Sequence, residues 1–83
     1  MALFMDMHNI DGGVAAKDVA DAHLADLKTQ DRYGVHYLRY WVDESAGKVF
    51  CLVDAPDRDL AERVHREAHG LTADAIYPVV EGA

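Results

Sequence analysis

The chain has 83 residues, enough for a single domain spanning 1–83, and its 15 acidic against eight basic residues give a formal net charge of −7. That charge would repel nucleic-acid phosphates and anionic lipid heads, so neither nucleic acid nor membrane is an expected partner. The chain has one cysteine, which excludes an intrachain disulfide or a cysteine-based metal site. It has no apolar run of membrane length and no basic signal segment, so the protein is expected to be cytoplasmic.

The first two predicted elements are a strand and a helix. Residues 3–8 alternate with a period of two, which is typical of a strand. A turn rich in Asn, Asp and Gly covers 9–13, and residues 14–30 then place apolar side chains at helical spacing. His23 shares that apolar stripe, so we expect a hydrogen-bonded core residue there rather than a metal ligand.

A hairpin, a second helix and a last strand follow. Residues 35–43 and 48–53 are rich in aromatic and branched side chains on either side of a short turn, which predicts the hairpin. Asp57 can cap a helix over 57–69, where Gly70 ends it. Pro78 interrupts the final apolar run 75–80, so this strand is expected at a sheet edge.

The order βαββαβ favours an α+β class fold, a ferredoxin-like sandwich in which an antiparallel sheet carries both helices on one face. Alternation assigns one set of residues to the helix side of the sheet: Leu3, Met5, Leu38, Tyr40, Val42, Phe50 and Leu52. It assigns a second set to the uncovered side: Phe4, Asp6, His8, Tyr37, Arg39, Trp41 and Cys51. Because an aromatic face should not stay in water, we expect a homodimer that joins two such faces into a dimeric α/β barrel, with Asp6, His8, Arg39 and Cys51 in or around the interface.

The histidines are the candidate metal ligands. His65 and His69 are four residues apart on the second helix, so they project from one face and can hold one ion. Their neighbours in the sequence indicate a solvent-accessible flank, where both could equally be ordinary surface residues. His8 and His36 lie at predicted strand ends, where Asp11 could complete a site, and the alternative is again simple exposure.

A ligand set of imidazole and carboxylate suits Ni(II), Cu(II) or Zn(II), while the lack of clustered thiolates disfavours Cu(I) and iron–sulfur centres. Imidazoles bind metals only when neutral, so such a site would release its ion as the histidines become protonated near pH 6 to 7. The residues alone leave the choice among these metals open.

The whole chain also resembles a known family. The segments Phe4-Met5-Asp6, Ala22-His23, 37–42 (YLRYWV) and 50–56 (FCLVDAP), in this order and spacing, are similar to small ferredoxin-like proteins catalogued as a domain of unknown function that includes a nickel-binding member. The resemblance implies a dimeric ferredoxin-like fold and Ni(II) binding for sequestration or detoxification, without catalysis.

We therefore expect a nickel-binding homodimer whose surface ligands are His8, His36, His65 and His69, with carboxylates or water at the remaining positions. The alternatives are a small dimeric α/β-barrel enzyme of the monooxygenase or isomerase type and a ligand-binding module, both of which would use the open sheet face. Cys51 is expected to be a small buried hydrophobic residue rather than a nucleophile.

Overall fold

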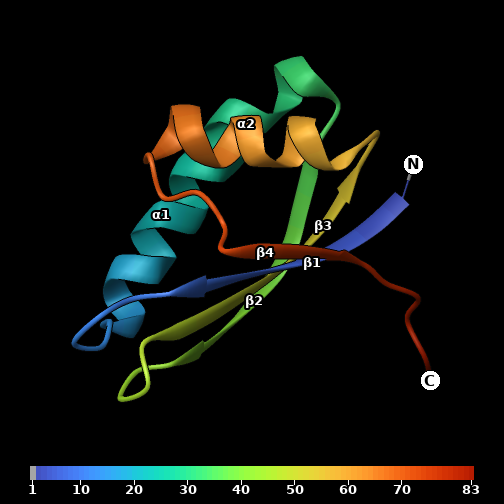
Figure 1. Ribbon diagram of the computed structural model, residues 1–83. Coiled ribbons are helices and arrows are strands. Elements are labelled where there is room, and N and C mark those ends of the chain that lie inside the picture. Colours follow the sequence, from blue (N-terminus) through green and yellow to red (C-terminus); the bar gives the residue numbers. More distant parts are fainter. Residues whose placement is uncertain (1) are drawn as a thin grey trace.

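Strands and helices follow one another in the predicted order βαββαβ (Figure 1). The computed structural model describes residues 2–83, and its elements are β1 (Ala2–Asn9), α1 (Ala16–Thr29), the 3-10 helix η1 (Gln30–Tyr33), β2 (His36–Asp43), β3 (Lys48–Ala55), α2 (Arg58–Ala68) and β4 (Ala75–Pro78). The four strands form one antiparallel sheet in the order β2-β3-β1-β4. Both helices cover the same face of this sheet, which is the arrangement of a ferredoxin-like fold (Figure 1).

Local chemistry explains where the helices begin. Helix α1 has no capping side chain at Ala15, and its first amide, that of Ala16, instead donates to the Glu44 carboxylate at 2.7 Å. Helix α2 begins as predicted, because the Asp57 carboxylate accepts from the Leu60 amide at 2.9 Å. Both helix starts are therefore stabilised by carboxylates, which also interact favourably with the helix dipole.

The β2–β3 turn is tied to the β1–α1 turn by a close approach of their backbones. The Ile10 amide donates to the Gly47 carbonyl at 2.7 Å, and Gly47 has a φ of 67°. A Cβ atom at this position would collide with the Ile10 carbonyl oxygen. Glycine is required here for both reasons, and the contact fixes the two turns next to each other.

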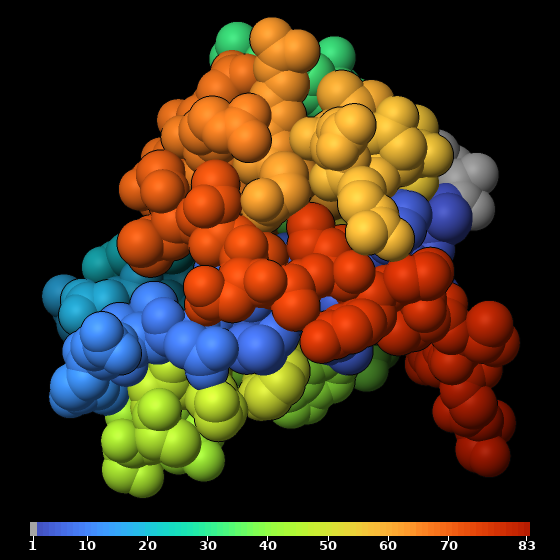
Figure 2. Space-filling model, viewed as in Figure 1, coloured from blue at the N-terminus to red at the C-terminus, as the bar shows by residue number. Residues whose placement is uncertain are grey.

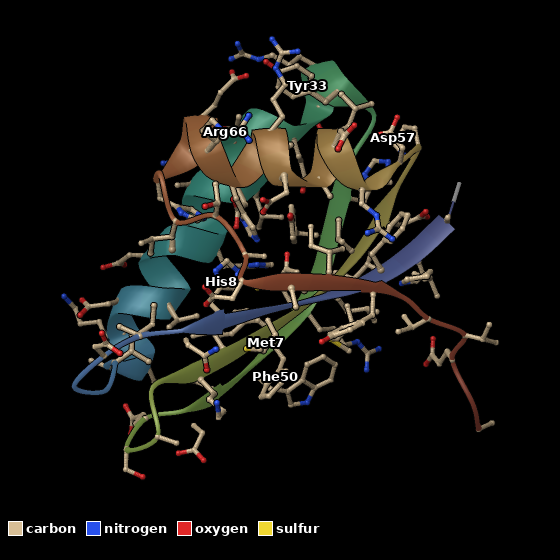
Figure 3. All side chains as sticks on the ribbon, viewed as in Figure 1. Met7, His8, Tyr33, Phe50, Asp57 and Arg66 are labelled. Atoms are coloured by element: carbon tan, nitrogen blue, oxygen red, sulfur yellow. The ribbon has the colours of Figure 1, made fainter. Side chains whose placement is uncertain are left out.

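The two faces of β1 and β3 are opposite to the prediction. Met7 and Phe50 point away from the helices, whereas His8 points toward them (Figure 3). Burial follows the same alternation, because every second residue of both strands is buried under α1 and α2. The residues predicted to be on the open side but found under the helices are Phe4, Asp6, His8, Tyr37 and Cys51.

Strand β2 keeps part of its predicted orientation because its register shifts between Tyr37 and Arg39. Tyr37 is buried opposite Val53, yet beyond the irregularity Trp41 lies on the open face opposite Phe50. A one-residue shift moves all following side chains to the other face of a sheet. Tyr40 and Val42 are therefore packed against the core as predicted.

The sheet face without helices is largely apolar. Pairs that lie side by side on it are Met5 with Leu52, Met7 with Phe50, and Phe50 with Trp41, which is 48% exposed. Within residues 2–83, strand β4 pairs with β1 alone and forms an edge of the sheet, as Pro78 predicted. The segment after β4 projects from the body of the protein (Figure 2). Neither helix in residues 2–83 is long and apolar enough to cross a bilayer.

Candidate metal centre

His65 is the centre of a polar cluster between the sheet and the helices. Its side chain is almost completely buried, because α2 turns Ala61, Val64 and His65 toward the sheet together. The prediction that this residue is accessible on a helix flank is therefore wrong. Residues 61 and 65 are four apart, so a helix that buries Ala61 also buries His65.

Two aspartates from distant parts of the chain hold the His65 ring from both sides. The Nε2 atom of His65 donates to the Asp6 carboxylate at 2.9 Å, and Nδ1 donates to the Asp26 carboxylate at 2.9 Å. Asp6 comes from β1 and Asp26 from α1, and both are buried. Since each ring nitrogen donates to a carboxylate, His65 is an imidazolium held between two anions.

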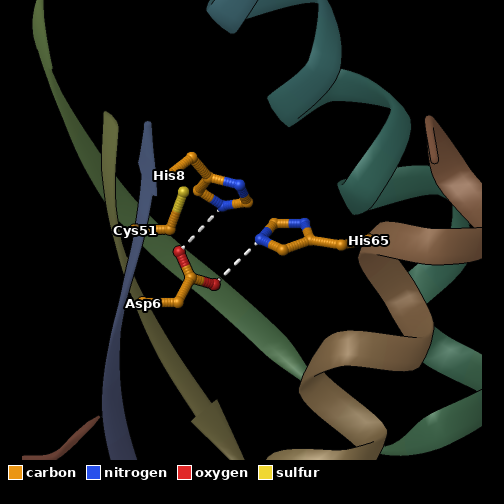
Figure 4. Close-up of side chains that lie close together, drawn as sticks. All are labelled: Asp6, His8, Cys51 and His65. Carbon is orange, nitrogen blue, oxygen red and sulfur yellow. Dashed lines mark hydrogen bonds and ion pairs between the residues drawn. The ribbon is translucent and has the colours of Figure 1, made fainter. Parts of the chain in front are cut away.

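The side chains around Asp6 complete the inner part of the cluster (Figure 4). His8 Nε2 lies 3.1 Å from the other oxygen of Asp6. The Tyr37 hydroxyl is 3.3 Å from Asp6 and donates to the Ala61 carbonyl at 2.8 Å, and its ring stacks on His65. Cys51 is buried beside His8, as a small hydrophobic residue would be, but it also lies among the polar groups.

His69 lies at the outer end of the cluster. Its Nε2 atom is 3.1 Å from the Asp26 carboxylate and 3.1 Å from Nδ1 of His65. The Leu71 amide donates to the other ring nitrogen, Nδ1, at 3.1 Å. In neutral His69 the ring proton is therefore on Nε2, which donates to Asp26.

The charges of the cluster stabilise one another. Burial would lower the pKa of His8, but its hydrogen bond to Asp6 raises the pKa to about 9. Burial acts on His65 in the same way, and its hydrogen bonds to Asp26 and Asp6 raise its pKa to about 11. For the carboxyl groups of Asp6 and Asp26, burial would raise the pKa, but hydrogen bonds from the histidines lower it.

Three ligand atoms at the outer end of the cluster form a nearly equilateral triangle. The distances between Asp26 Oδ1, His65 Nδ1 and His69 Nε2 are 2.9, 3.1 and 3.1 Å. An octahedral ion with metal–ligand distances of about 2.1 Å has adjacent ligands about 3.0 Å apart, whereas a tetrahedral ion separates them by about 3.4 Å. These edges are hydrogen-bond lengths and are also close to the separation of neighbouring ligands on one ion, so the three atoms are near enough to bind a single metal. The donor set of two imidazoles and one carboxylate suits a divalent transition metal.

The triangle lies at the wall of a pocket of about 70 Å³. Asp26, His65 and His69 all line it, together with His8, His23 and Cys51. Asp18 also lines the pocket, and the remaining lining side chains are apolar: Ile10, Val14, Val19, Ala22, Val49 and Leu71. His23 also packs against Tyr40, with ring centroids 4.9 Å apart, and is half-buried.

Three of the four predicted ligands meet at this cluster, and one does not. His8, His65 and His69 lie around the pocket, although His8 and His65 are buried rather than at the surface. His36 is exposed and pairs with Asp54, which also pairs with Leu3 at the far end of β1 from His8. Strands β1 and β2 run parallel on either side of β3, so the end of one and the start of the other lie at opposite ends of the sheet.

Sequence reasoning did not find the two aspartates that hold His65. Asp6 is 59 residues from His65 in the sequence and Asp26 is 39 residues from it, so no local spacing connects them. The available signal was an acidic residue within the apolar pattern of each element, since buried carboxylates occur almost only with partners.

Comparison with known proteins agrees with this fold. The family model described as "Nickel responsive protein SCO4226-like" matches residues 4–79. The crystal structure of SCO4226 from Streptomyces coelicolor A3(2) is similar to this chain with a TM-score of 0.90 and 35% sequence identity, covering 99% of this chain and 100% of the other. Among curated proteins there is no significant match. The chain belongs to the SCO4226-like family of nickel-responsive proteins.

Proposed function

We propose that this protein binds one Ni(II) ion per chain through Asp26, His65 and His69 and sequesters the ion without catalysing a reaction. The observation that carries the proposal is the triangle of three ligand atoms with edges of 2.9, 3.1 and 3.1 Å. The nickel-responsive description of the family supports this choice of metal over others with the same geometry.

Asp6 would orient His65 for this role. A metal ion at Nδ1 of His65 replaces the proton that this atom now donates to Asp26, whereas the hydrogen bond from Nε2 to Asp6 at 2.9 Å is retained. A carboxylate behind a metal-binding imidazole fixes its tautomer and makes it a stronger ligand. Burial of both groups gives this orientation its rigidity.

His69 must change its tautomer to bind a metal ion. A metal ion at Nε2 requires the ring proton to be on Nδ1, which now accepts from the Leu71 amide. Binding of the metal ion at His69 therefore breaks this hydrogen bond and shifts the start of the loop after α2. We expect the amide NMR resonance of Leu71 to move when the diamagnetic ion Zn(II) is bound at the triangle, although Leu71 itself is not a ligand.

The proposal is tested by calorimetric titration of the metal-free protein with Ni(II), Cu(II) and Zn(II). We expect Asp26→Asn and His69→Ala each to weaken Ni(II) binding at least tenfold. His36→Ala is the matched control, because this histidine is exposed and outside the cluster, and it should leave the affinity unchanged. Equal weakening by His36→Ala, or no effect of the other two substitutions in folded protein, would contradict the triangle as the site.

We further propose that the protein is a homodimer formed by its open sheet faces, which would close the two sheets into an α/β barrel. The apolar pairs on this face, which include Trp41 at 48% exposure, support this arrangement. Sedimentation should show a dimer for the wild type and a monomer for Trp41→Glu. Leu24→Glu is the control, since Leu24 is 54% exposed on α1 and should not affect assembly.

A further inference from the structure

We infer that the pocket beside the triangle binds a short-chain aliphatic carboxylate, whose head group completes the coordination of the metal ion. This inference rests on the proposed metal site and names the second ligand that this site would take. It is carried by the position of the triangle at the wall of a pocket that is lined mostly by apolar surface, although His8, His23 and Asp18 also contribute to the lining.

Three protein atoms leave an octahedral ion with three further positions. The triangle residues line the same pocket as the apolar side chains, so an ion seated on the triangle would direct open positions into that pocket. A fully aqueous site would be lined by polar groups around these positions. Val14, Val19 and Ala22 from the α1 side and Val49 from β3 instead give an environment that favours a hydrocarbon chain.

Charge favours an anionic head group. A divalent ion bound by one carboxylate and two neutral imidazoles has a net charge of +1, because Asp26 is the only acidic residue in the triangle. The second buried carboxylate, Asp6, already accepts from His65 and His8. Asp18 at the pocket wall is exposed, so water screens its charge. A monoanion would neutralise the remaining charge, which a neutral ligand would not do.

The size of the pocket limits the length of the chain. Its volume of about 70 Å³ is enough for roughly five to seven water molecules at about 10–15 Å³ each. This corresponds to a ligand of about six non-hydrogen atoms, such as butyrate. Leu71, which is 50% exposed at the wall of the pocket, leaves a route for such a ligand to enter.

The experiment compares butyrate with acetate on the nickel-loaded protein. Each ligand is titrated into the loaded protein while the visible absorption of Ni(II) is recorded, which reports a change in its coordination. Burial of one methylene group is worth about fourfold in affinity, so butyrate, with two more, should bind about fifteenfold more tightly than acetate. Equal affinities would overturn the inference. Calorimetric titration of the metal-free protein with butyrate is the control, and equally tight binding there would also overturn it.

Two variants test the pocket itself. Ala22→Leu fills the apolar part of the pocket and leaves the triangle unchanged, so nickel should still bind while the preference for butyrate disappears. Ala16→Leu is the same substitution at an exposed position on α1 outside the pocket, and it should behave like the wild type. A preference for butyrate that survives Ala22→Leu would overturn the inference. Absence of any nickel signal before carboxylate is added would overturn the proposed function as well, which separates the two failures.

Discussion

Asp6→Asn should be one of the most destabilising single substitutions in this protein. Asp6 has no exposed surface and lies at hydrogen-bond distance from His65 at 2.9 Å, His8 at 3.1 Å and the Tyr37 hydroxyl at 3.3 Å. An asparagine can accept through only one oxygen, and its amide group would point a donor at one of the two imidazolium rings. A buried cation would then lack its counter-ion.

The expected loss can be worked out from this geometry. Removing one partner of a buried ion pair typically costs about 3–5 kcal/mol, because the remaining charge is left uncompensated. A domain of 83 residues has a free energy of unfolding of about 4–12 kcal/mol in total. Asp6→Asn should therefore remove about a quarter or more of the free energy of unfolding, and it should do so without any metal present.

Urea unfolding followed by circular dichroism measures this loss, with wild type and variant at the same protein concentration because assembly affects apparent stability. Asp54→Asn is a suitable control, since Asp54 is a half-buried carboxylate of β3 outside the cluster. If Asp6→Asn lost less than about 1 kcal/mol relative to the wild type, the description of the cluster as mutually stabilised charges would be refuted.

Three further predictions concern pH, a helix cap and a turn. His8 has a folded-state pKa of about 9 against an ordinary value of 6.5. Its contribution to the free energy of unfolding is therefore complete below pH 6.5 and is lost as the pH rises through 9. The free energy of unfolding should fall by about 3 kcal/mol between pH 6.5 and 9.5 from this residue alone, and a flat urea midpoint over that range would count against the cluster. Asp57→Ala removes the acceptor of the Leu60 amide and should cost about 1 kcal/mol in the same assay; an unchanged midpoint would show that the cap is dispensable. Gly47→Ala should cost more than Gly70→Ala, because both glycines have positive φ but only the first would collide with backbone, and equal thermal midpoints for the two variants would contradict this.

The sequence allowed one part of the site to be predicted but not the other. The i, i+4 spacing of His65 and His69 correctly brought these two side chains together, because helical periodicity is a local property. The same spacing could not show that His65 faces the sheet, since the apolar stripe of α2 and the histidine lie on adjacent helical positions. Its partners Asp6 and Asp26 come from other elements, and only their packing makes them neighbours.

The sequence by itself determined the order of the elements, the Asp57 cap and the edge position of β4, because turn residues, caps and proline act on the backbone where they stand. It could not determine which face of β1 is covered. Leu3, Met5 and Met7 look more like a core face than Phe4, Asp6 and His8, and yet the second set is buried. Tertiary structure decided this, because the two helices bring charged partners to the buried polar side chains of β1. The pairing of these buried charges depends on several elements at once and cannot be read from any one segment of the sequence.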